Sequence, residues 1–148
     1  MRALVQRVSR ARVLVTDDLV GQIDRGILIF LGIHREDKQQ DAEWLARKVL
    51  HLRIFDDERG KMNRSVIDIG GGVLVVPQFT LYGETKKGNR PSYTDAASPD
   101  YAKSLCNYFC QLCENSGILV AAGQFQAHMT VELVNDGPVT LWCDTQAS

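Results

Sequence analysis

The segment that most constrains the fold of this chain is Gly72–Gly83, in which a short apolar run ends abruptly in polar residues. Its first part, Val73–Val76, is mostly β-branched and long enough to form a strand buried on both faces. Pro77, Gln78 and Thr80 follow directly. A core strand that ends in this way either closes a hairpin, with its polar side chains bonded to neighbouring backbone, or presents them to a ligand. The segment alone leaves both interpretations open.

The length of 148 residues and the hydrophobic share of 45% predict one globular domain, residues 1–148, with a single core. A formal net charge of −1 argues against a protein that coats nucleic acid through bulk charge, but it is compatible with contact to one end of an RNA. Residues 1–7 alternate as in a strand and show no basic region followed by a long apolar run. We therefore expect a cytoplasmic protein without a membrane span.

Three of the four cysteines, Cys106, Cys110 and Cys113, recur at the spacing of one helix face. This pattern is typical of small buried hydrophobic residues in a reducing compartment. Cys110 and Cys113 have the spacing of half a zinc site, but Cys106 and Cys143 make a poor second pair. We therefore expect no metal.

The first half of the chain predicts several strands. Residues 2–8 and 11–16 alternate between apolar and polar side chains, which predicts a hairpin with Ser9-Arg10 as its tight connection. Residues 26–33 are almost continuously apolar, as in a strand of a sheet that is covered on both faces.

The second half returns to strands near its end. Three segments have strand patterns, namely residues 118–121, 128–134 and 139–143. Between the last two, the composition of Asn135-Asp136-Gly137-Pro138 predicts a tight turn.

Two helices are predicted between these groups of strands. Asp37 with Gln40 resembles a capping box at the start of a helix that continues to about Leu52. Ser98 as N-cap with Pro99 at the first helical position begins a second helix, which Gly117 ends. Because strands and helices are segregated, we expect one compact α+β domain with a curved, barrel-like, mostly antiparallel or mixed sheet and two main helices.

A long polar segment, residues 84–95, has no periodicity and contains Lys86, Lys87 and Arg90. Long loops in small domains are often functional. The basic side chains either contact phosphate or are simply solvated, and the sequence alone favours neither interpretation.

No motif of a common enzyme class is present. The histidines, His34, His51 and His128, lack the spacing of metal ligands or of a nucleophile motif, so we expect them to be structural or exposed. The Gly137-Pro138 bond lies in a predicted tight turn, where a cis X-Pro bond is to be suspected.

Taken together, several motifs resemble the D-aminoacyl-tRNA deacylase family over essentially the whole chain. They are residues 3–8, 53–55, 60–63, 73–76, 78–81, 90–92, 97–99 and 135–140. Each motif is weakly informative alone, whereas their order and spacing are specific. The resemblance implies hydrolysis of the ester that joins a D-amino acid, or glycine mischarged on tRNA-Ala, to the 3′ end of tRNA, without metal or organic cofactor.

The resemblance also implies a homodimer with two active sites at the subunit interface. Each site would contain the Gln78–Leu81 segment of one subunit and Gly137 and Pro138, joined by a cis bond, from the other. The carbonyls of Gly137 and Pro138 would exclude an L side chain, which is discrimination by clash. Arg7 matches the family arginine that supports this turn, and a guanidinium that donates to exposed carbonyls is a sound reason for it.

Thr80 is a candidate nucleophile, but no base is evident beside it in the sequence. The alternative is an oxyanion hole formed by the backbone N–H groups of Phe79 and Thr80, with water as the attacking group. Phe125 and Met129 match family positions near the adenosine pocket, where Phe125 would stack on the base, although ordinary core packing also explains them.

One residue departs from the pattern, because bacterial family members usually have serine where this chain has Pro77. A relaxed-specificity paralogue carries Pro-Gln there, so an aminoacyl-tRNA deacylase of relaxed specificity is one alternative. A non-catalytic homo-oligomeric module that binds a small ligand or the end of a tRNA is another, since the chain shows no catalytic triad.

Overall fold

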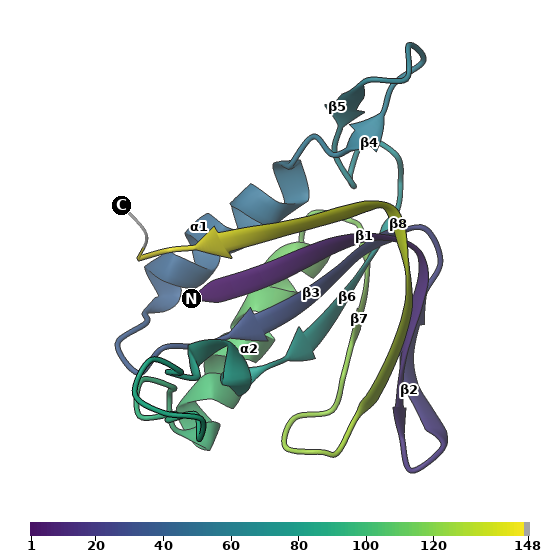
Figure 1. The fold of residues 1–148 in the computed structure, drawn as a ribbon. Helices are drawn as coiled ribbons and strands as arrows, with labels where there is room; N and C mark the ends of the chain where they lie inside the picture. The colour runs from purple at the N-terminus through teal and green to yellow at the C-terminus, as the bar shows by residue number, and fades with distance from the viewer. Residues whose placement is uncertain (147–148) are drawn as a thin grey trace.

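The computed structural model describes residues 1–146 (Figure 1). Residues 147 and 148 of the predicted domain lie outside the described residues. The elements, in chain order, are β1 (Arg2–Val15), β2 (Asp18–Ile23), β3 (Gly26–Gly32), α1 (Gln39–His51), β4 (Phe55–Asp56), β5 (Met62–Arg64), β6 (Gly72–Pro77), the 3-10 helix η1 (Phe79–Tyr82), α2 (Pro99–Glu114), β7 (Leu119–Ala122) and β8 (Thr130–Asp144).

The main sheet is mixed and strongly curved. Its order is β2-β1-β3-β6-β7, with β8 also paired to β1. The pairs made by β1 are antiparallel, whereas β3–β6 and β6–β7 are parallel. The curvature brings β2 close to β7, since a Cβ atom on Gly21 would lie 2.7 Å from the carbonyl oxygen of Ala122. The predicted α+β domain with a barrel-like sheet and two main helices is confirmed.

The predicted hairpin within the first 16 residues is wrong, because β1 is one long strand. Its first half pairs with β3, from Arg2↔Gly32 to Val8↔Gly26, and its second half pairs with β2. Register shifts in the pairing with β8 bend the strand near Val8 instead of reversing it. The chain reverses at Thr16-Asp17, where both residues have positive φ, at 48° and 66°, as primed hairpin turns require.

The predicted turn at residues 135–138 is also wrong. Strand β8 continues through these residues, and both of its halves pair with β1. Val8 pairs with Asn135 and Gln6 pairs with Thr140, so residues 136–139 bulge opposite Arg7 alone. The Gly137-Pro138 bond within this bulge is cis, which confirms that part of the prediction.

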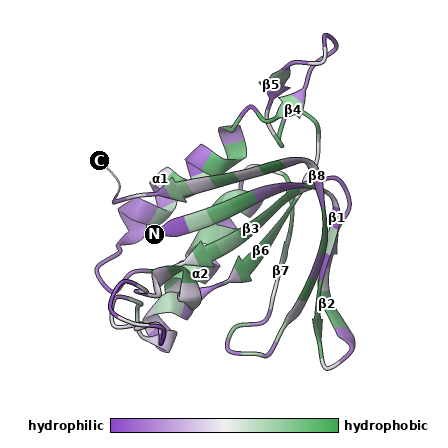
Figure 2. Ribbon diagram, viewed as in Figure 1, coloured by the Kyte–Doolittle hydropathy of each residue, from purple (hydrophilic) through white to green (hydrophobic). Residues whose placement is uncertain are grey.

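The core lies on both faces of the sheet, which confirms the prediction for residues 26–33. One cluster joins Ile27, Ile29 and Leu31 of β3 to apolar side chains of α1 and α2. A smaller cluster on the other face includes Leu28 and the β6 residues Leu74 and Val76. Figure 2 shows the resulting hydrophobic colour of β3 and β6. Burial on both faces fixes the position of the β6 end, where the candidate site lies.

Helix α2 begins as predicted, with Ser98 as N-cap and Pro99 in its first turn. Helix α1 does not use the predicted capping box, since its N-cap is Lys38, whose N–H donates to the Asp41 carboxylate at 2.8 Å. Asp37 instead points inward. Its buried carboxylate accepts from the α-ammonium of Met1 at 2.8 Å and from the N–H of His34 at 2.6 Å.

All four cysteines are free, and Cys106 and Cys113 are buried, as the helical spacing predicts. Among residues 1–146, no helix is long and apolar enough to cross a membrane.

Candidate active site

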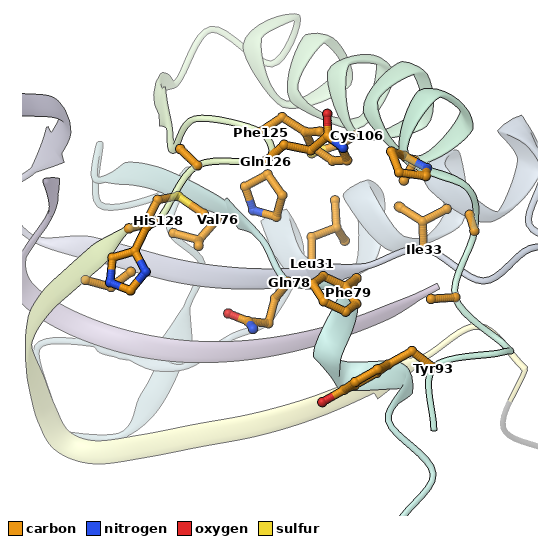
Figure 3. Close-up of a pocket in the computed structure, with 18 residues that line it drawn as sticks. Leu31, Ile33, Val76, Gln78, Phe79, Tyr93, Cys106, Phe125, Gln126 and His128 are labelled. Atoms are coloured by element: carbon orange, nitrogen blue, oxygen red, sulfur yellow. The ribbon is translucent and has the colours of Figure 1, made fainter. Parts of the chain in front are cut away.

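A pocket of about 480 Å³ lies where β6 ends (Figure 3). The side chains of its wall come from four segments of the chain: residues 31–33 at the end of β3, residues 76–79 at the end of β6, residues 93–106 around the start of α2, and residues 125–131 around the start of β8. Most of the wall is apolar. Its polar side chains are Gln78, Tyr93, Gln126 and His128. A mostly apolar cavity with a few polar groups is the usual form of a small-molecule site.

The sequence at Pro77 and Gln78 explains why strand β6 ends there. Pro77 has no N–H to continue the strand ladder, and the N–H of Gln78 makes a last bond to the carbonyl of Leu31 at 2.8 Å. The chain then forms η1, so the residues after β6 form a helical turn and not a hairpin strand. Of the two interpretations of this strand end, the second therefore holds for Gln78: its side chain lines the pocket, where a ligand can reach it.

The backbone at the start of η1 has free donors. Within residues 1–146, no acceptor is bonded to the N–H of Phe79 or of Thr80. These are the first N–H groups of a helical turn, which have no partner inside the turn itself. Gln78 and Phe79, the residues on either side of the first of these N–H groups, both line the pocket, whereas Thr80 does not.

The side chain of Thr80 has no base beside it. Its hydroxyl accepts a hydrogen bond from the amide of Gln78, which cannot take up a proton, and Thr80 is not part of the pocket wall. Within residues 1–146, no histidine, lysine or carboxylate is hydrogen-bonded to this hydroxyl. The geometry therefore gives no support to Thr80 as an activated nucleophile.

Phe125 and Met129 both line the pocket, as the resemblance implies. Phe125 also packs against the helical side of the core, and Met129 packs against the smaller cluster. The two interpretations offered for these residues, pocket and core, are therefore compatible. Gly123 gives Met129 its space, since a Cβ atom there would lie 2.7 Å from the Met129 sulfur.

Sequence reasoning missed most residues of the wall, among them Tyr93, Cys106, Gln126 and His128. His128 is exposed, as expected, but it lines the pocket, and so do Tyr93 and Cys106 (Figure 3). The sequence did offer a signal for His128, because it lies only three residues after Phe125, which the family resemblance placed near the pocket. Cys106 is not a nucleophile, because its hydrogen bond with Cys110 and its burial raise the pKa of its thiol.

Arg7, Gly137 and Pro138 form a second cluster, away from the pocket of the same chain. None of the three lines the pocket. The Nη1 of Arg7 donates at 2.7 Å to the carbonyl of Ile54, the residue before β4, and Figure 1 shows β4 and η1 at opposite ends of the sheet.

The Arg7 side chain contacts the bulge of β8, residues 136–139, and stabilises it. Its Nε donates to the Asp136 carbonyl at 3.1 Å and lies 3.3 Å from the Asp136 carboxylate. Gly137 has φ of +115°, and a Cβ atom there would lie 2.5 Å from Nη2 of Arg7, so only glycine fits. Asn135, whose role the sequence did not reveal, donates to the carbonyls of Arg7 and Val139, both at 3.0 Å. These bonds leave Gly137 and Pro138 exposed at the surface.

The part of the chain that the structure describes contains no group of three or more His, Cys, Asp or Glu residues placed to hold a metal ion.

Comparisons with known proteins agree over the full length of the chain. A sequence model of the family described as D-Tyr-tRNA(Tyr) deacylase matches residues 4–144. A D-aminoacyl-tRNA deacylase of Thermotoga petrophila is 57% identical over 145 residues, which cover 98% of this chain and 97% of the relative. A D-aminoacyl-tRNA deacylase of Clostridioides difficile is 50% identical over 148 residues, which cover 100% of this chain and 99% of the relative.

Two solved structures share the fold. One, a c-Myc DNA unwinding element binding protein, has a TM-score of 0.94 and 40% identity, and the match covers 99% of this chain and 100% of the other. The second, described as a probable eukaryotic D-amino acid tRNA deacylase, has a TM-score of 0.83 and 18% identity, with 96% and 97% covered. This fold and these relatives define a deacylase, a hydrolase that acts on ester bonds. The chain belongs to the D-Tyr-tRNA(Tyr) deacylase family.

Proposed function

We propose that this chain hydrolyses the ester between a D-amino acid and the terminal adenosine of tRNA, and rejects the L-aminoacyl ester. The observation that carries the proposal is the mostly apolar pocket at the end of β6, which Gln78 and Phe79 line, together with the unbonded N–H groups of Phe79 and Thr80 in the turn that follows. We expect this activity in the cytoplasm, because tRNA is charged there.

The chemical step needs no catalytic side chain. Water attacks the ester carbonyl carbon, and the N–H groups of Phe79 and Thr80 bind the oxyanion that forms. The bond to the ribose oxygen then breaks, and the proton that the attacking water loses passes to that oxygen, relayed by the neighbouring 2′-hydroxyl of the tRNA. Loss of one such donor typically costs about 3 kcal/mol of transition-state stabilisation. The ester of an aminoacyl-tRNA is already activated, so positioning and charge stabilisation suffice.

Phe125 and Met129 bind the adenine in this proposal. Both have an apolar face on the pocket while their other side is fixed in the core. Stacking on an aromatic ring typically contributes about 1–3 kcal/mol per base. Gln78, whose side chain lines the same pocket, orients the aminoacyl group (Figure 3).

The active form is a homodimer in which each pocket receives Gly137 and Pro138 of the second copy. Three observations support this arrangement: both residues are exposed, they are absent from the pocket of their own chain, and apolar side chains near them on β8 are exposed. Those side chains are Val134, Leu141 and Trp142. A second copy would cover them and complete the site.

Chiral selection follows from this geometry. Carbonyls of Gly137 and Pro138 would occupy the space of an L side chain and accept a hydrogen bond from the substrate ammonium group. Arg7 would position them through its bond to the neighbouring Asp136 carbonyl. Glycine has no side chain to clash, so glycyl-tRNA, including glycine mischarged on tRNA-Ala, is also a substrate.

A deacylation assay with D-tyrosyl-, L-tyrosyl-, glycyl- and L-alanyl-tRNA tests the proposal. We expect turnover of the D-tyrosyl and glycyl esters while both L esters persist. Turnover of L-alanyl-tRNA would support a deacylase of relaxed specificity, for which Pro77 in the pocket wall is the specific observation. No turnover of any ester, together with binding of tRNA, would support a non-catalytic module and overturn the proposal.

A further inference from the structure

A second feature of the molecule lies beside the pocket and is not used by the proposed chemistry. Residues 84–92 form a loop whose two ends are joined by a pair of backbone hydrogen bonds. The N–H of Glu84 donates to the Ser92 carbonyl at 2.7 Å, and the N–H of Ser92 donates to the Glu84 carbonyl at 3.0 Å. Lys86, Lys87 and Arg90 lie between these ends, and we call these three residues the basic tip.

The base of the loop is fixed against the candidate site. Tyr93 packs the edge of its ring against Phe79, with 5.1 Å between the ring centroids. Gly83, which follows η1, is so close to the loop that a Cβ atom there would lie 3.0 Å from the Tyr93 ring and 3.6 Å from Pro91. Phe79 and Tyr93 both line the pocket, and Tyr93 directly follows the loop, so the base of the loop adjoins the pocket wall.

The charges of the basic tip are not neutralised by the protein. All three side chains are exposed, and no carboxylate of residues 1–146 lies within 4.0 Å of their cationic groups. Neither acidic residue of the surrounding segment forms an ion pair with these three side chains. Asp95 lies 3.7 Å from Arg35, and the Glu84 carboxylate accepts from the backbone N–H of Lys86 at 2.6 Å. Figure 2 shows the hydrophilic colour of this loop beside η1.

A chain with a formal net charge of −1 thus concentrates three free cations next to one pocket. The pocket, at about 480 Å³, has room for one nucleoside with its ester, so the rest of a tRNA must leave through the mouth. That RNA carries one phosphate per nucleotide, and flexible lysine and arginine side chains bind such a backbone without reading its sequence.

We propose that the basic tip, Lys86, Lys87 and Arg90, binds phosphates of the tRNA acceptor arm just before the terminal adenosine. This inference rests on the proposed function, because it assumes that the terminal adenosine occupies the pocket. The tip holds the RNA and takes no part in the chemical step. Its contribution is therefore confined to substrates that carry these phosphates.

The test compares two charge-neutralised variants with wild type. The first is Lys86→Gln/Lys87→Gln in the tip. The matched control is Arg47→Gln/Lys48→Gln, an adjacent exposed pair of cations on α1. For each protein, kcat/KM is measured with D-tyrosyl-tRNA at a series of salt concentrations, and with the D-tyrosyl ester of adenosine, which has no phosphate.

With tRNA at low salt, we expect the tip variant to lose roughly tenfold in kcat/KM and the control variant to match wild type. Each contact to a single strand contributes about 0.7 to the slope of log K against log salt. The tip variant lacks two such contacts. When the salt concentration rises approximately fourfold, the factor by which kcat/KM falls should therefore be about seven times smaller in the tip variant than in wild type. Adding Arg90→Gln should flatten the dependence further.

With the adenosine ester, all the proteins should be equal. A tip variant with the same salt slope as the control variant on tRNA would overturn the inference, and so would an equal loss on the adenosine ester. Failure of the proposed function looks different, because wild type would then hydrolyse neither ester.

Discussion

The guanidinium of Arg2 donates a hydrogen bond at 2.8 Å to the carbonyl of Leu81, inside the turn that carries Phe79 and Thr80. The same group lies 4.4 Å from the centroid of the Tyr82 ring and bonds the Asp144 carboxylate through Nε at 3.1 Å. Arg2 thereby fixes η1 to both β1 and β8. Planar donors in a fixed geometry make arginine better suited to this position than lysine.

Replacing Arg2 by methionine should therefore reduce kcat about tenfold while KM changes little, because a small misplacement of the oxyanion donors weakens transition-state binding. Arg2→Lys should recover part of the loss. Steady-state kinetics with D-tyrosyl-tRNA give the split, and urea unfolding of both variants checks the fold. A change confined to unfolding stability, with kcat intact, would contradict a positioning role.

Thr80→Ala and Thr80→Val should each retain hydrolysis to within about threefold of wild type, because the proposed oxyanion donor is the backbone N–H and not the hydroxyl. Single-turnover rates with D-tyrosyl-tRNA provide the measurement. Removal of a true nucleophile typically costs about 10⁴-fold or more. A loss of that size in a folded, tRNA-binding variant would return Thr80 to the role of nucleophile.

Stereochemical rejection should act between subunits. Pro138→Ala should admit L-tyrosyl-tRNA, and Ala102→Trp should fill the pocket and abolish turnover, since Ala102 is buried in its wall. An excess of Ala102→Trp subunits, mixed with Pro138→Ala subunits, then pairs each working pocket with an intact Gly137-Pro138. L-ester hydrolysis should disappear from the mixture while D-ester hydrolysis persists.

The control for this experiment is a mixture of Pro138→Ala subunits with wild-type subunits that have been heat-inactivated and cannot exchange. If L-ester hydrolysis per Pro138→Ala subunit is the same in both mixtures, the site lies within one chain.

Asp37 should be essential for stability. Its carboxylate is fully buried and faces the α-ammonium of Met1. Breaking such a pair leaves an uncompensated charge, which costs about 3 kcal/mol or more. Asp37→Asn should lower the free energy of unfolding by this amount in urea titrations, whereas Asp41→Asn, at the exposed start of α1, should cost far less. Equal effects of the two would show that the buried pair contributes little.

Two aspartates, the half-buried Asp57 and the exposed Asp68, predict sensitivity to acid. Hydrogen bonds from the N–H groups of Lys61 and Arg59 hold the pKa of Asp57 below 3.8, and the N–H of Ser65 does the same for Asp68. A pKa lower in the folded state than in the unfolded state adds stability that is complete above the unfolded value. That stability is lost as the pH falls through the folded value.

Urea unfolding at a series of pH values should therefore show a decline below about pH 4. The variant Asp57→Asn/Asp68→Asn should be less stable near neutral pH and should show a shallower decline. An unchanged slope in this variant would assign the acid sensitivity to other carboxylates.

The fold was predictable from the sequence where a short local motif determines the secondary structure. It was less predictable where pairing between distant strands determines it. Pro99 after Ser98 marked the start of α2 because both residues have a strong positional preference. By contrast, Ser9-Arg10 looked like a turn between two alternating segments, whereas pairing with β8 keeps the strand continuous there. Asn135-Asp136 has turn composition too, but its amide bonds hold a bulge.

The candidate site shows the same limit. Gln78 and Phe79 were found because a polar group after a buried strand is conspicuous within a short segment. Tyr93 and His128 come from other parts of the chain, and only the folded sheet brings them to the pocket. At the start of helix α1, two acidic residues could have capped the helix. Asp37 instead binds the buried α-ammonium of Met1, and Asp41 accepts the hydrogen bond from the N–H of the N-cap residue Lys38.

The long pairing of β1 with β8 has a consequence for biosynthesis. The register begins at Arg2↔Asp144, so the strand made first pairs along its length with the strand made last. Until β8 leaves the ribosome, β1 presents a free, largely apolar edge that can pair with another chain. Such non-local pairing also slows folding. A nascent chain of this protein is therefore expected to need protection from aggregation until β8 has been made and has paired with β1.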